Sequence, residues 1–492
     1  MIVKISPTRI NLVGYEGKKL LLQSQLTYIN KSIDYQILKF KKNGYWFIRN
    51  YGKEEYDEKL ASLKSLKTQC LLFEDDSGFW TYSGLASFLS KTFSDTIVDQ
   101  VEYPEPKLIP FECSLKHPPR PYQDEAVKLL VEAKHGAIEY GTGAGKSQIL
   151  AMLCKYYGLK TVISTPSVNI ANQIYNEFIY LFGKKYVGKF YGGKKESNKL
   201  FIIAVTNSLV NVEKGDSNYE DLLEVKVICL DEAHRSAADT LSTVFTQGPL
   251  KNAPYRFSVS GTQFRHDGKD LLLDSIIGPI VKHLSVKDLV DQNYLAKPEF
   301  RMVWVNSDIK CASDDPKKLI QAHVYKNPEV AKIAAGFIEQ CVNLLNKPTI
   351  VLIEEFSQFQ ALLPFLTVPF RFCHSGATKD NKGKIPAEYH KSDVDAFVKE
   401  FNEGKVPLLI GTDCITTGTD MPPTGAIIYL KGISSPIDLA QAVGRGTRKV
   451  PGKDDFLFID IGIKNVPMLL NQAKKRIVVY NSIYDNYDDI DL

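Results

Sequence analysis

The chain has 492 residues and a formal net charge of +4; 44% of its residues are hydrophobic and 24% are charged. Because single domains usually hold ~100 to 200 residues, this length predicts roughly three domains, and the composition excludes a disordered or fibrous protein. The small net charge excludes strong bulk attraction for phosphate, so any nucleic-acid binding must come from local grooves.

Targeting and redox signals point to the cell interior. Residues 1–15 contain Lys4 and Arg9 but no continuous apolar core, and no run elsewhere approaches the ~20 apolar residues that cross a bilayer. The eight cysteines are scattered and include no C-x-x-C pair, which argues against a zinc site or a dense disulfide framework. We therefore expect a protein of a reducing intracellular compartment such as the cytoplasm, and not a secreted one.

Residues 1–103 alternate short apolar runs with turn signals, which predicts a small α+β domain. Within this domain, the spacing of apolar residues predicts a helix over 54–66. The next segment, 104–119, is rich in proline, whose fixed φ angle and missing N–H group oppose regular structure. We expect a linker there.

From residue 120 onward, short apolar runs alternate with amphipathic segments. Such runs are typical of strands that are buried on both faces of a parallel sheet. One series predicts strands at 136–139, 161–164, 200–205, 225–230 and 256–259, and a second at 300–305, 349–353, 370–373, 407–410, 426–430 and 456–461. The predicted fold class is therefore α/β, with two parallel-sheet lobes in tandem, 120–297 and 298–492, after the small α+β domain.

A glycine-rich loop, GTGAGKS at 141–147, follows the expected strand 136–139 and precedes an expected helix over 148–157. Small residues let backbone N–H groups approach phosphates at a helix N-terminus. In such a P-loop, Lys146 would reach the β- and γ-phosphates and Ser147 would hold Mg²⁺. Tyr140 departs from the pattern because it stands where the first glycine is expected, and a chance glycine-rich turn is the alternative. The residues that would line the phosphates through their backbone are Thr142, Gly143, Ala144 and Gly145.

An acidic pair ends the expected strand 225–230, as Asp231-Glu232-Ala233-His234. The carboxyl edge of an α/β sheet is where ligands bind, and the P-loop lies at the same edge. Asp231 is suited to orient Mg²⁺ through its water shell, and Glu232 to polarise an attacking water as a general base. Taken alone, the motif could also be a solvated helix start, where acidic residues are favoured.

The stronger signal in the second lobe is the segment QAVGRGTR, residues 441–448. Arginines three residues apart lie on one helical face and can present two guanidinium groups to one anion. In the functional interpretation, Gln441 belongs to the catalytic motif, and Arg445 and Arg448 act as arginine fingers on the γ-phosphate after lobe closure. A solvated basic helix face is the alternative.

Together these motifs resemble the superfamily 2 helicases with a DEAH signature, which are built from two RecA-like lobes. The resemblance covers about residues 120–460. It implies that the chain hydrolyses ATP with Mg²⁺ as cofactor. It also accommodates Tyr140, since helicases of this superfamily often relax the first P-loop glycine.

The resemblance assigns further roles motif by motif. Arg120, Tyr122 and Gln123 resemble the adenine-recognition element. Ser260, Gly261 and Thr262 stand where the family has a Ser-Ala-Thr linker that, with His234, would couple the ATP and nucleic-acid sites. Ordinary turns and helix caps are the alternative for any one of these residues. The other matches are Thr165, Pro166, Asn207, Ser208 and Thr412 for nucleic acid, and Gly418 and Asp420 for nucleotide.

The compact size, Arg265, His266 and the segments 285–290 and 295–298 resemble phage recombination helicases of the UvsW kind and bacterial fork-reversal helicases. This resemblance implies an ATP-dependent motor that unwinds or remodels branched DNA in a bacterial or phage-infected cell. An RNA helicase and a nucleic-acid-binding protein with an ATP-controlled conformational switch are the alternatives. We expect the N-terminal domain to contact duplex DNA through basic and aromatic residues, unless these aromatics form core: Lys39, Lys41, Lys42, Tyr45, Trp46 and Arg49.

Overall fold

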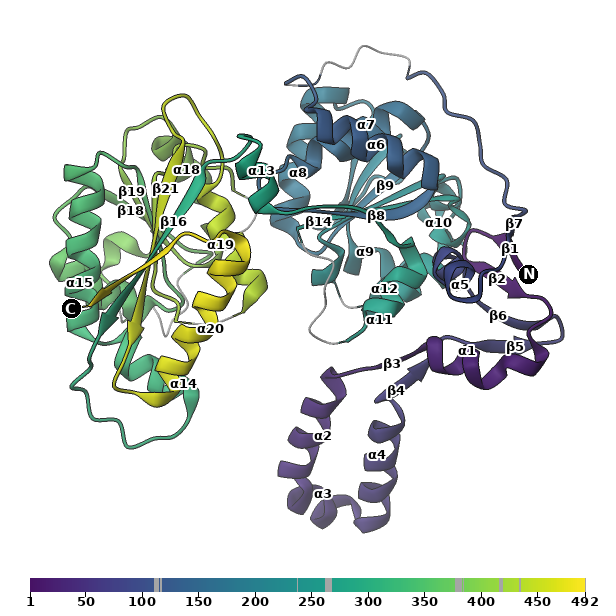
Figure 1. Cartoon of the computed structure of the whole chain (residues 1–492), viewed down its shortest axis with the longest axis horizontal. Helices are drawn as coiled ribbons and strands as arrows, with labels where there is room; N and C mark the ends of the chain where they lie inside the picture. Colours follow the sequence, from purple (N-terminus) through teal and green to yellow (C-terminus); the bar gives the residue numbers. More distant parts are fainter. Residues whose placement is uncertain are drawn as a thin grey trace. The chain divides into compact units, whose positions relative to one another are not determined.

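The computed structural model describes residues 1–109, 115, 117–236, 238–261, 268–376, 383, 385–415, 419–432 and 435–491. The chain forms two compact units, which Figure 1 shows coloured along the sequence. The first unit contains residues 1–140 and 146–283, and the second contains residues 141–145 and 284–492. The predicted lobe boundary at 297/298 falls inside the strand Lys297–Val305 of the second unit.

An eight-stranded sheet forms the centre of the first unit. Its strand order is β11-β10-β12-β9-β13-β14-β8-β15. The strands from β10 to β8 pair parallel with one another, whereas β11 pairs antiparallel with β10. All residues of β9, β12 and β14 are buried. In β12, burial on both faces appears in the sequence as the unbroken apolar run FIIAV. The strands are β8 (His135–Tyr140), β9 (Thr161–Thr165), β10 (Val187–Tyr191), β11 (Lys194–Lys195), β12 (Phe201–Val205), β13 (Val227–Asp231), β14 (Tyr255–Ser260) and β15 (Ile280–Leu284).

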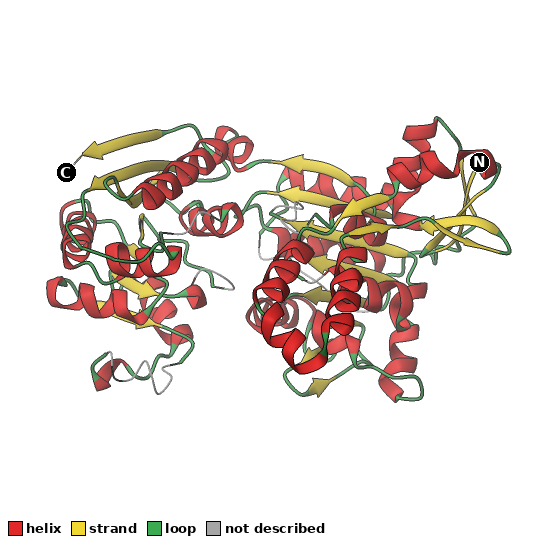
Figure 2. Ribbon diagram, turned by 90° about the horizontal axis from the view of Figure 1, so that it is seen from below, coloured by secondary structure: helices red, strands yellow, loops and turns green. Residues whose placement is uncertain are grey.

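Helices flank this sheet on both sides, and Figure 2 shows them in red around the yellow strands. Each helix buries one apolar stripe, as in α8, where Ile170, Ile174, Phe178 and Leu181 recur at helical spacing. The helices of this sheet are α6 (Pro121–Ala133), α7 (Lys146–Tyr157), α8 (Val168–Phe182), α9 (Thr206–Val210), α10 (Ser217–Leu223), α11 (Ala238–Ser242) and α12 (Asp270–Ile277).

The N-terminal part of the first unit has its own five-stranded sheet, in the order β5-β6-β2-β1-β7. Its core includes Ala238 and Leu272, so it packs on α11 and α12 of the larger sheet. Gly84 allows this contact, because a Cβ at this position would lie 2.2 Å from the carbonyl oxygen of Asp274. The elements are β1 (Ile2–Ser6), β2 (Arg9–Leu12), β5 (Phe73–Asp75), β6 (Gly78–Tyr82), β7 (Ile97–Asp99), α1 (Lys19–Gln25) and α5 (Ala86–Phe93).

A helical hairpin is inserted into this N-terminal part. It leaves from β3 (Thr27–Ile29) and returns through β4 (Thr68–Cys70), which pair antiparallel with each other. Between them lie α2 (Ser32–Lys42), α3 (Gly44–Tyr51) and α4 (Lys53–Ser65), visible at the lower edge of Figure 1. The predicted helix 54–66 is α4, and the apolar run 44–49 is the helix α3.

A seven-stranded sheet, in which every strand is parallel to its neighbours, forms the second unit. Its order is β18-β19-β17-β20-β21-β16-β22. Successive residues of a strand point to opposite faces of the sheet and belong to different hydrophobic cores. Val351 packs in the core with α15 and α16, whereas Ile350 packs in the core with α18 and α19. The strands are β16 (Lys297–Val305), β17 (Thr349–Leu352), β18 (Phe370–Cys373), β19 (Leu408–Gly411), β20 (Ala426–Tyr429), β21 (Asp455–Ile463) and β22 (Tyr487–Asp491).

The two-lobe α/β fold predicted from the sequence is confirmed, with helices on both faces of the second sheet as well. Among the helices in the described parts of the chain, none has the length and apolar character needed to cross a membrane. The helices of the second unit are α13 (Val286–Asp291), α14 (Pro316–Ile320), α15 (Pro328–Glu339), α16 (Phe356–Leu362), α18 (Val394–Asn402), α19 (Pro436–Gly446) and α20 (Pro467–Ile483).

Candidate active site

Lys146 is the first residue of α7 and lies close to the acidic pair of the first unit. Its Nζ atom is 3.4 Å from Glu232 Oε1 and 3.4 Å from the carbonyl oxygen of Tyr140. The side chains of Lys146 and Glu232 are only 12% and 14% exposed. The structure therefore brings together the lysine and the glutamate that the sequence predicts for phosphate binding and for water activation.

The acidic pair is held in an unusual backbone conformation. Asp231 ends β13, and Glu232 follows with φ +49° and ψ 43°, in the left-handed region that non-glycine residues rarely adopt. The N–H of Glu232 donates to the carbonyl oxygen of Val259 in β14 at 3.1 Å. Such strain persists where the surroundings fix it, and it is common at functional sites.

The two carboxylates differ in proton affinity. Burial and the neighbouring charge of Glu232 raise the pKa of Asp231. Burial also pushes the pKa of Glu232 upward, but Lys146, His234 and the Ser260 hydroxyl outweigh burial and hold it below its ordinary value. Glu232 is thus the carboxylate that stays ionised most readily, as a general base must.

Ser260 and His234 fix the second oxygen of Glu232. The Ser260 hydroxyl, at the end of β14, donates to Glu232 Oε2 at 3.1 Å, and His234 Nδ1 lies 2.7 Å from the same hydroxyl. His234 is buried. The predicted coupling residues Ser260 and His234 are therefore in direct contact with the acidic pair, whereas the third one, Thr262, lies outside the described residues.

Hydroxyl groups also connect the neighbouring strand ends. Thr206, which begins α9 after β12, lies 2.9 Å from Ser164 Oγ and donates to the carbonyl oxygen of Thr165 at 3.1 Å. Thr165 itself is buried and donates to the carbonyl oxygen of Ser167. The other residues predicted for nucleic acid in this unit are more accessible: Asn207 is exposed, and Pro166 and Ser208 are half-buried.

The expected adenine-recognition residues lie at the start of α6. Gln123 is buried and accepts a hydrogen bond from the N–H of Arg120 at 2.9 Å, while Arg120 Nη1 donates to the Tyr122 hydroxyl at 2.8 Å. Tyr122 is buried, and its ring meets that of Tyr140 edge to face at 5.8 Å between centroids. Tyr140 thus links this element to the residue just before the phosphate loop.

The phosphate loop, Gly141–Gly145, packs with the second unit, while Ser147 is the second residue of α7 in the first. Gly143 and Gly145 have φ values of +88° and +74°, which favour glycine. The N–H of Ala144 donates to the carbonyl oxygen of Gly141 at 3.2 Å. Within the second unit, the Thr142 hydroxyl donates to the carbonyl oxygen of Ala440 in α19 at 3.3 Å.

The prediction that both arginines lie on one face of a helix is wrong. Arg445 lies in α19, but this helix ends at Gly446, and Arg448 lies beyond it in a bridge with Leu295. The last residue of the helix must be a glycine, because a Cβ at Gly446 would lie 2.0 Å from the ring of Phe456 in β21. The Thr447 hydroxyl donates to the carbonyl oxygen of Gly444 at 3.0 Å and closes the last turn.

Both arginines contact the loop before β20. Arg445 Nη1 donates to the carbonyl oxygen of Thr419, and Arg448 Nη1 forms an ion pair with Asp420. The predicted nucleotide residue Asp420 is therefore a partner of the predicted arginine finger Arg448. Gln441 is half-buried in α19, and Gly418 lies outside the described residues.

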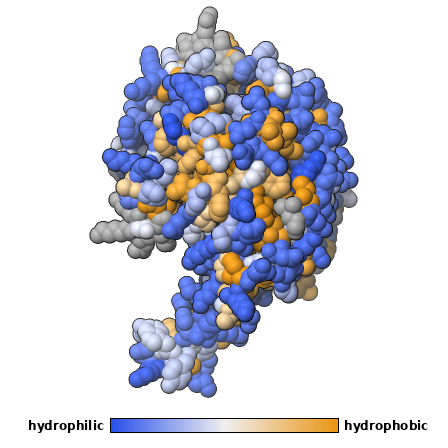
Figure 3. Space-filling view, turned by 90° about the vertical axis from the view of Figure 1, so that its left-hand side faces the viewer, coloured by the Kyte–Doolittle hydropathy of each residue, from blue (hydrophilic) through white to orange (hydrophobic). Residues whose placement is uncertain are grey.

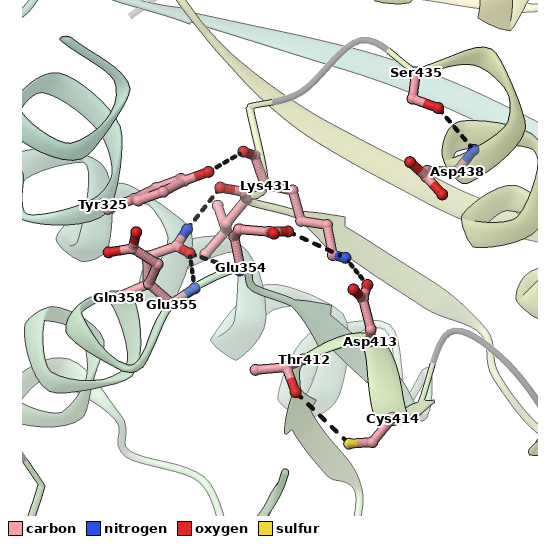
Figure 4. Close-up of polar contacts among 11 residues, drawn as sticks. Tyr325, Glu354, Glu355, Gln358, Thr412, Asp413, Cys414, Lys431, Ser435 and Asp438 are labelled. Carbon is pink, nitrogen blue, oxygen red and sulfur yellow. Dashed lines mark hydrogen bonds and ion pairs between the residues drawn. The ribbon is translucent and has the colours of Figure 1, made fainter. Parts of the chain in front are cut away.

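The carboxyl edge of the second sheet contains charged residues that the sequence interpretation did not assign. Lys431 is buried and forms ion pairs with Asp413 and, at 3.4 Å, with Glu354 (Figure 4). Thr412, predicted to contact nucleic acid, precedes Asp413 and directs its hydroxyl at Cys414 Sγ, 3.8 Å away. A lysine directly after the apolar run 426–430 is the sequence signal that could have drawn attention to this cluster.

Two family models match the chain, one in each unit. Residues 116–265 match "Type III restriction enzyme, res subunit", and residues 338–450 match "Helicase conserved C-terminal domain". The match in the first unit includes Lys146 and Glu232, and the match in the second includes Arg445 and Arg448.

Similar proteins carry helicase and restriction-enzyme names. The chain is 24% identical over 405 residues to the DNA 3'-5' translocase XPB2 of Sulfurisphaera tokodaii, covering 77% of this chain and 88% of the relative. It is 21% identical over 389 residues to the ATP-dependent DNA helicase uvsW of Enterobacteria phage T4, covering 73% and 72%. In fold, it is similar to a fragment of a putative type I restriction enzyme HsdR subunit from Vibrio vulnificus YJ016, with a TM-score of 0.52 and 17% identity over 77% of this chain and 70% of that one.

The two matches follow the order of the two α/β units, and both fall on the sheets that carry the candidate catalytic residues. The chain belongs to the superfamily 2 helicases and is an ATP-hydrolysing enzyme.

Proposed function

We propose that this helicase is an ATP-driven motor on DNA that unwinds or remodels branched duplexes, as in fork reversal or branch migration during recombination, repair or replication. The observation that carries the proposal is the contact between Lys146, Glu232 and Ser260 at the carboxyl edge of the first sheet. A phosphate-binding lysine, a carboxylate beside it and a group that orients the carboxylate are parts that ATP hydrolysis requires. The names of the relatives, a DNA translocase and a DNA helicase, support DNA as the nucleic acid on which the motor acts.

We assign ATP and Mg²⁺ to the residues around Lys146. Asp231 offers a carboxylate and Ser147 a hydroxyl, and this donor set fits Mg²⁺, which takes few protein ligands in nucleotide sites and keeps water and phosphate oxygens. ATP would supply the phosphoanhydride bond whose cleavage drives the motor, and Mg²⁺ would offset the negative charge of the phosphates. Glu232 accepts the proton of the attacking water, and Lys146 stabilises negative charge on the phosphates.

We assign the stabilisation of the transferred phosphate to Arg445 and Arg448 as well. Guanidinium groups are always charged and bind planar anions through two donors, which suits a phosphoryl group in transfer. The ion pair with Asp420 restricts the position of the Arg448 guanidinium, and the side chain remains 38% exposed. Asp420, at the end of this pair, is a candidate contact for the ribose.

We assign binding of the nucleic-acid strand to residues at the carboxyl edges of the two β-sheets. Asn207 is exposed and its amide can reach a phosphate oxygen, and Thr412 stands at the end of β19. The buried Thr165 hydroxyl, which donates to Ser167, shapes the loop that precedes α8. Ser260 and His234 are suited to couple nucleic-acid binding to ATP hydrolysis, since both contact Glu232 or the hydroxyl that donates to it.

The helical hairpin of α2, α3 and α4 is the proposed contact with the DNA duplex. Its internal packing uses Phe40, Phe47 and Tyr56, with the rings of Phe40 and Tyr56 stacked at 4.9 Å. Tyr45 and Trp46 remain 83% and 59% exposed, so these aromatics are not core. At the lower edge of Figure 3, the visible face of the hairpin shows mainly hydrophilic and pale residues. Lysines and exposed aromatics together favour a nucleic-acid partner.

The proposal is tested by measuring ATP turnover and strand displacement with four substrates: single-stranded DNA, forked DNA, four-way DNA and a matched RNA fork. We expect DNA to stimulate turnover and branched DNA to be unwound. Equal or greater unwinding of RNA would favour the RNA helicase. Turnover that no nucleic acid changes would favour the binding protein with an ATP-controlled switch.

A further inference from the structure

Three charged residues meet at the carboxyl edge of the second sheet. In the parallel register, Leu352 of β17 lies beside Gly411 of β19 and beside Tyr429 of β20. Glu354, Asp413 and Lys431 each stand two residues beyond this row. Figure 4 shows their side chains converging, with Lys431 Nζ bonded to Asp413 and 3.4 Å from Glu354 Oε2.

The lysine is buried but the carboxylates are not. The Lys431 side chain is 3% exposed, whereas those of Asp413 and Glu354 are 75% and 37% exposed. The exposed charge of these three residues is therefore acidic, and the compensating positive charge is buried. An acidic edge repels phosphate, and Thr412, the proposed strand contact, is the neighbour of Asp413 in the chain.

The backbone around Lys431 is fixed by side chains from three helical segments, each of which donates to one of three successive carbonyl oxygens. Gln358 of α16 donates to Leu430 at 2.6 Å, and Tyr325, at the end of the π-helical turn Gln321–Tyr325, donates to Lys431 at 2.8 Å. Arg476 of α20 donates to Gly432 at 3.1 Å. These bonds hold the ammonium group in place beneath the edge.

Arg476 and Gln358 are themselves anchored. Arg476 is buried and forms an ion pair with Asp460 of β21 at 2.6 Å, and Gln358 accepts the N–H of Glu354 at 2.7 Å. The same glutamine thus fixes the backbone of Lys431 and that of one of its acidic partners. The backbone positions of Lys431 and Glu354 are therefore fixed by buried side chains of the fold.

We infer that Lys431 is a positioning residue for strand binding, which neutralises Asp413 and Glu354 so that a nucleic-acid phosphate can approach Thr412. This inference rests on the proposed function, because it requires a strand at this edge. Loss of the ammonium removes the positive charge that contacts both carboxylates and so increases the negative charge beside Thr412. Removal of the carboxylates together with the ammonium leaves a neutral edge, which a phosphate can approach again.

The test measures, for the wild type and for variants, the DNA concentration that gives half-maximal stimulation of ATP turnover. We expect Lys431→Met to raise this concentration about tenfold, because like charges are brought together. The triple variant Lys431→Met, Asp413→Asn, Glu354→Gln should restore it to near the wild-type value. A role of Lys431 in packing alone predicts no rescue, and unrescued loss would overturn the inference.

Salt gives a second readout. Added salt screens repulsion between the edge and the strand, so the deficit of Lys431→Met should shrink between 50 and 200 mM salt, about the range in which strand contacts are sensitive to ions. A deficit that stays constant would contradict the inference.

Asp413→Asn, a change at an exposed side chain, tests the same idea without altering the buried lysine and should lower the half-maximal concentration. An unchanged or higher value would also overturn it.

The matched control is Lys347→Met at the opposite edge of the same sheet. Lys347 precedes β17 and forms an ion pair at 2.7 Å with Asp455, the first residue of β21. We expect no change in the half-maximal concentration for this variant. If wild-type turnover does not respond to any nucleic acid, the proposed function itself fails; if it responds and Lys431→Met matches it, only this inference fails.

Discussion

The hydroxyl of Tyr140 donates a hydrogen bond to the backbone carbonyl oxygen of Tyr122 at 3.1 Å. Tyr140 is the residue that replaces the first glycine of the phosphate loop, and it is completely buried at the end of β8. Its ring packs edge to face on Tyr122, which belongs to the expected adenine-recognition element. The departure from the P-loop pattern therefore joins two parts of the proposed nucleotide site.

Replacing Tyr140 by the glycine of the common motif should harm the protein. Loss of a buried aromatic ring costs about 3 to 5 kcal/mol, and Tyr140→Phe, which loses only the hydroxyl, should cost about 0.5 to 1.5 kcal/mol. Urea unfolding followed by circular dichroism measures both. A Tyr140→Gly protein as stable as wild type would show that the ring is dispensable.

Ser260→Ala should slow ATP hydrolysis while leaving ATP binding nearly unchanged. The serine donates to Glu232 Oε2, and a hydrogen bond to a charged group is worth about 1.5 to 3 kcal/mol. If this energy is lost in the transition state, kcat falls about 10- to 100-fold. Steady-state turnover gives kcat and KM separately. The control is Ser275→Ala, a buried serine of α12 that donates to Leu272, which should retain wild-type kcat.

Arg448→Ala should reduce turnover by about 10³-fold or more, the effect expected for an arginine finger. Arg371→Ala is the control in the same unit, because Arg371 is a half-exposed arginine paired with Glu400 at 2.8 Å. Nucleotide binding, measured with a fluorescent ATP analogue, should survive in both. If Arg448→Ala hydrolyses ATP at the wild-type rate, Arg448 has no part in the chemistry and its pair with Asp420 is structural.

Gly446→Ala should destabilise the second unit, since the added methyl group would overlap the Phe456 ring. Overpacking of this kind costs about 1 to 3 kcal/mol. Gly336→Ala in α15 is a matched helix substitution with no atom within 4 Å of the new methyl group, and it should stabilise by about 0.5 to 1 kcal/mol. Unfolding midpoints that shift in the same direction for both variants would contradict this packing account of the helix end.

Charge reversal on the hairpin should weaken DNA binding. The triple change of Lys39, Lys41 and Lys42 to glutamate removes positive charge from α2, so the affinity for forked DNA should fall and its dependence on salt should flatten. Fluorescence anisotropy at several salt concentrations measures both. Reversal of the exposed Lys184 and Lys185 is the control. Unchanged affinity and salt slope in the hairpin variant would remove the hairpin from the DNA interface.

Buried strands could be predicted from the sequence because their apolar runs are a local signal. Val227–Asp231 is one example, since nearly every residue is covered from both faces. Edge strands were missed. Tyr487–Asp491 is acidic, and pairs with β16 on one side, where Asp488 forms an ion pair with Arg301 and Asp489 accepts from the indole of Trp304. Contacts between residues nearly 200 positions apart leave no local pattern.

The catalytic motifs could be predicted as far as their residues are contiguous. The end of α19 could not, since Gly446 packs against Phe456 of the next strand and Arg448 pairs with the distant Leu295. The cluster of Lys431, Asp413 and Glu354 could not be predicted either, since its members come from three strand ends that only the parallel register brings together.

In the proposed function, Glu232 activates water for an ATP-driven remodelling of branched DNA. The most direct measurement follows a fluorescently labelled four-way DNA junction with ATP and Mg²⁺, using wild type and Glu232→Gln. We predict conversion of the junction into duplex products by wild type, and none by Glu232→Gln despite retained binding of ATP and of the junction. Conversion by Glu232→Gln at the wild-type rate, or none by wild type, would contradict the account.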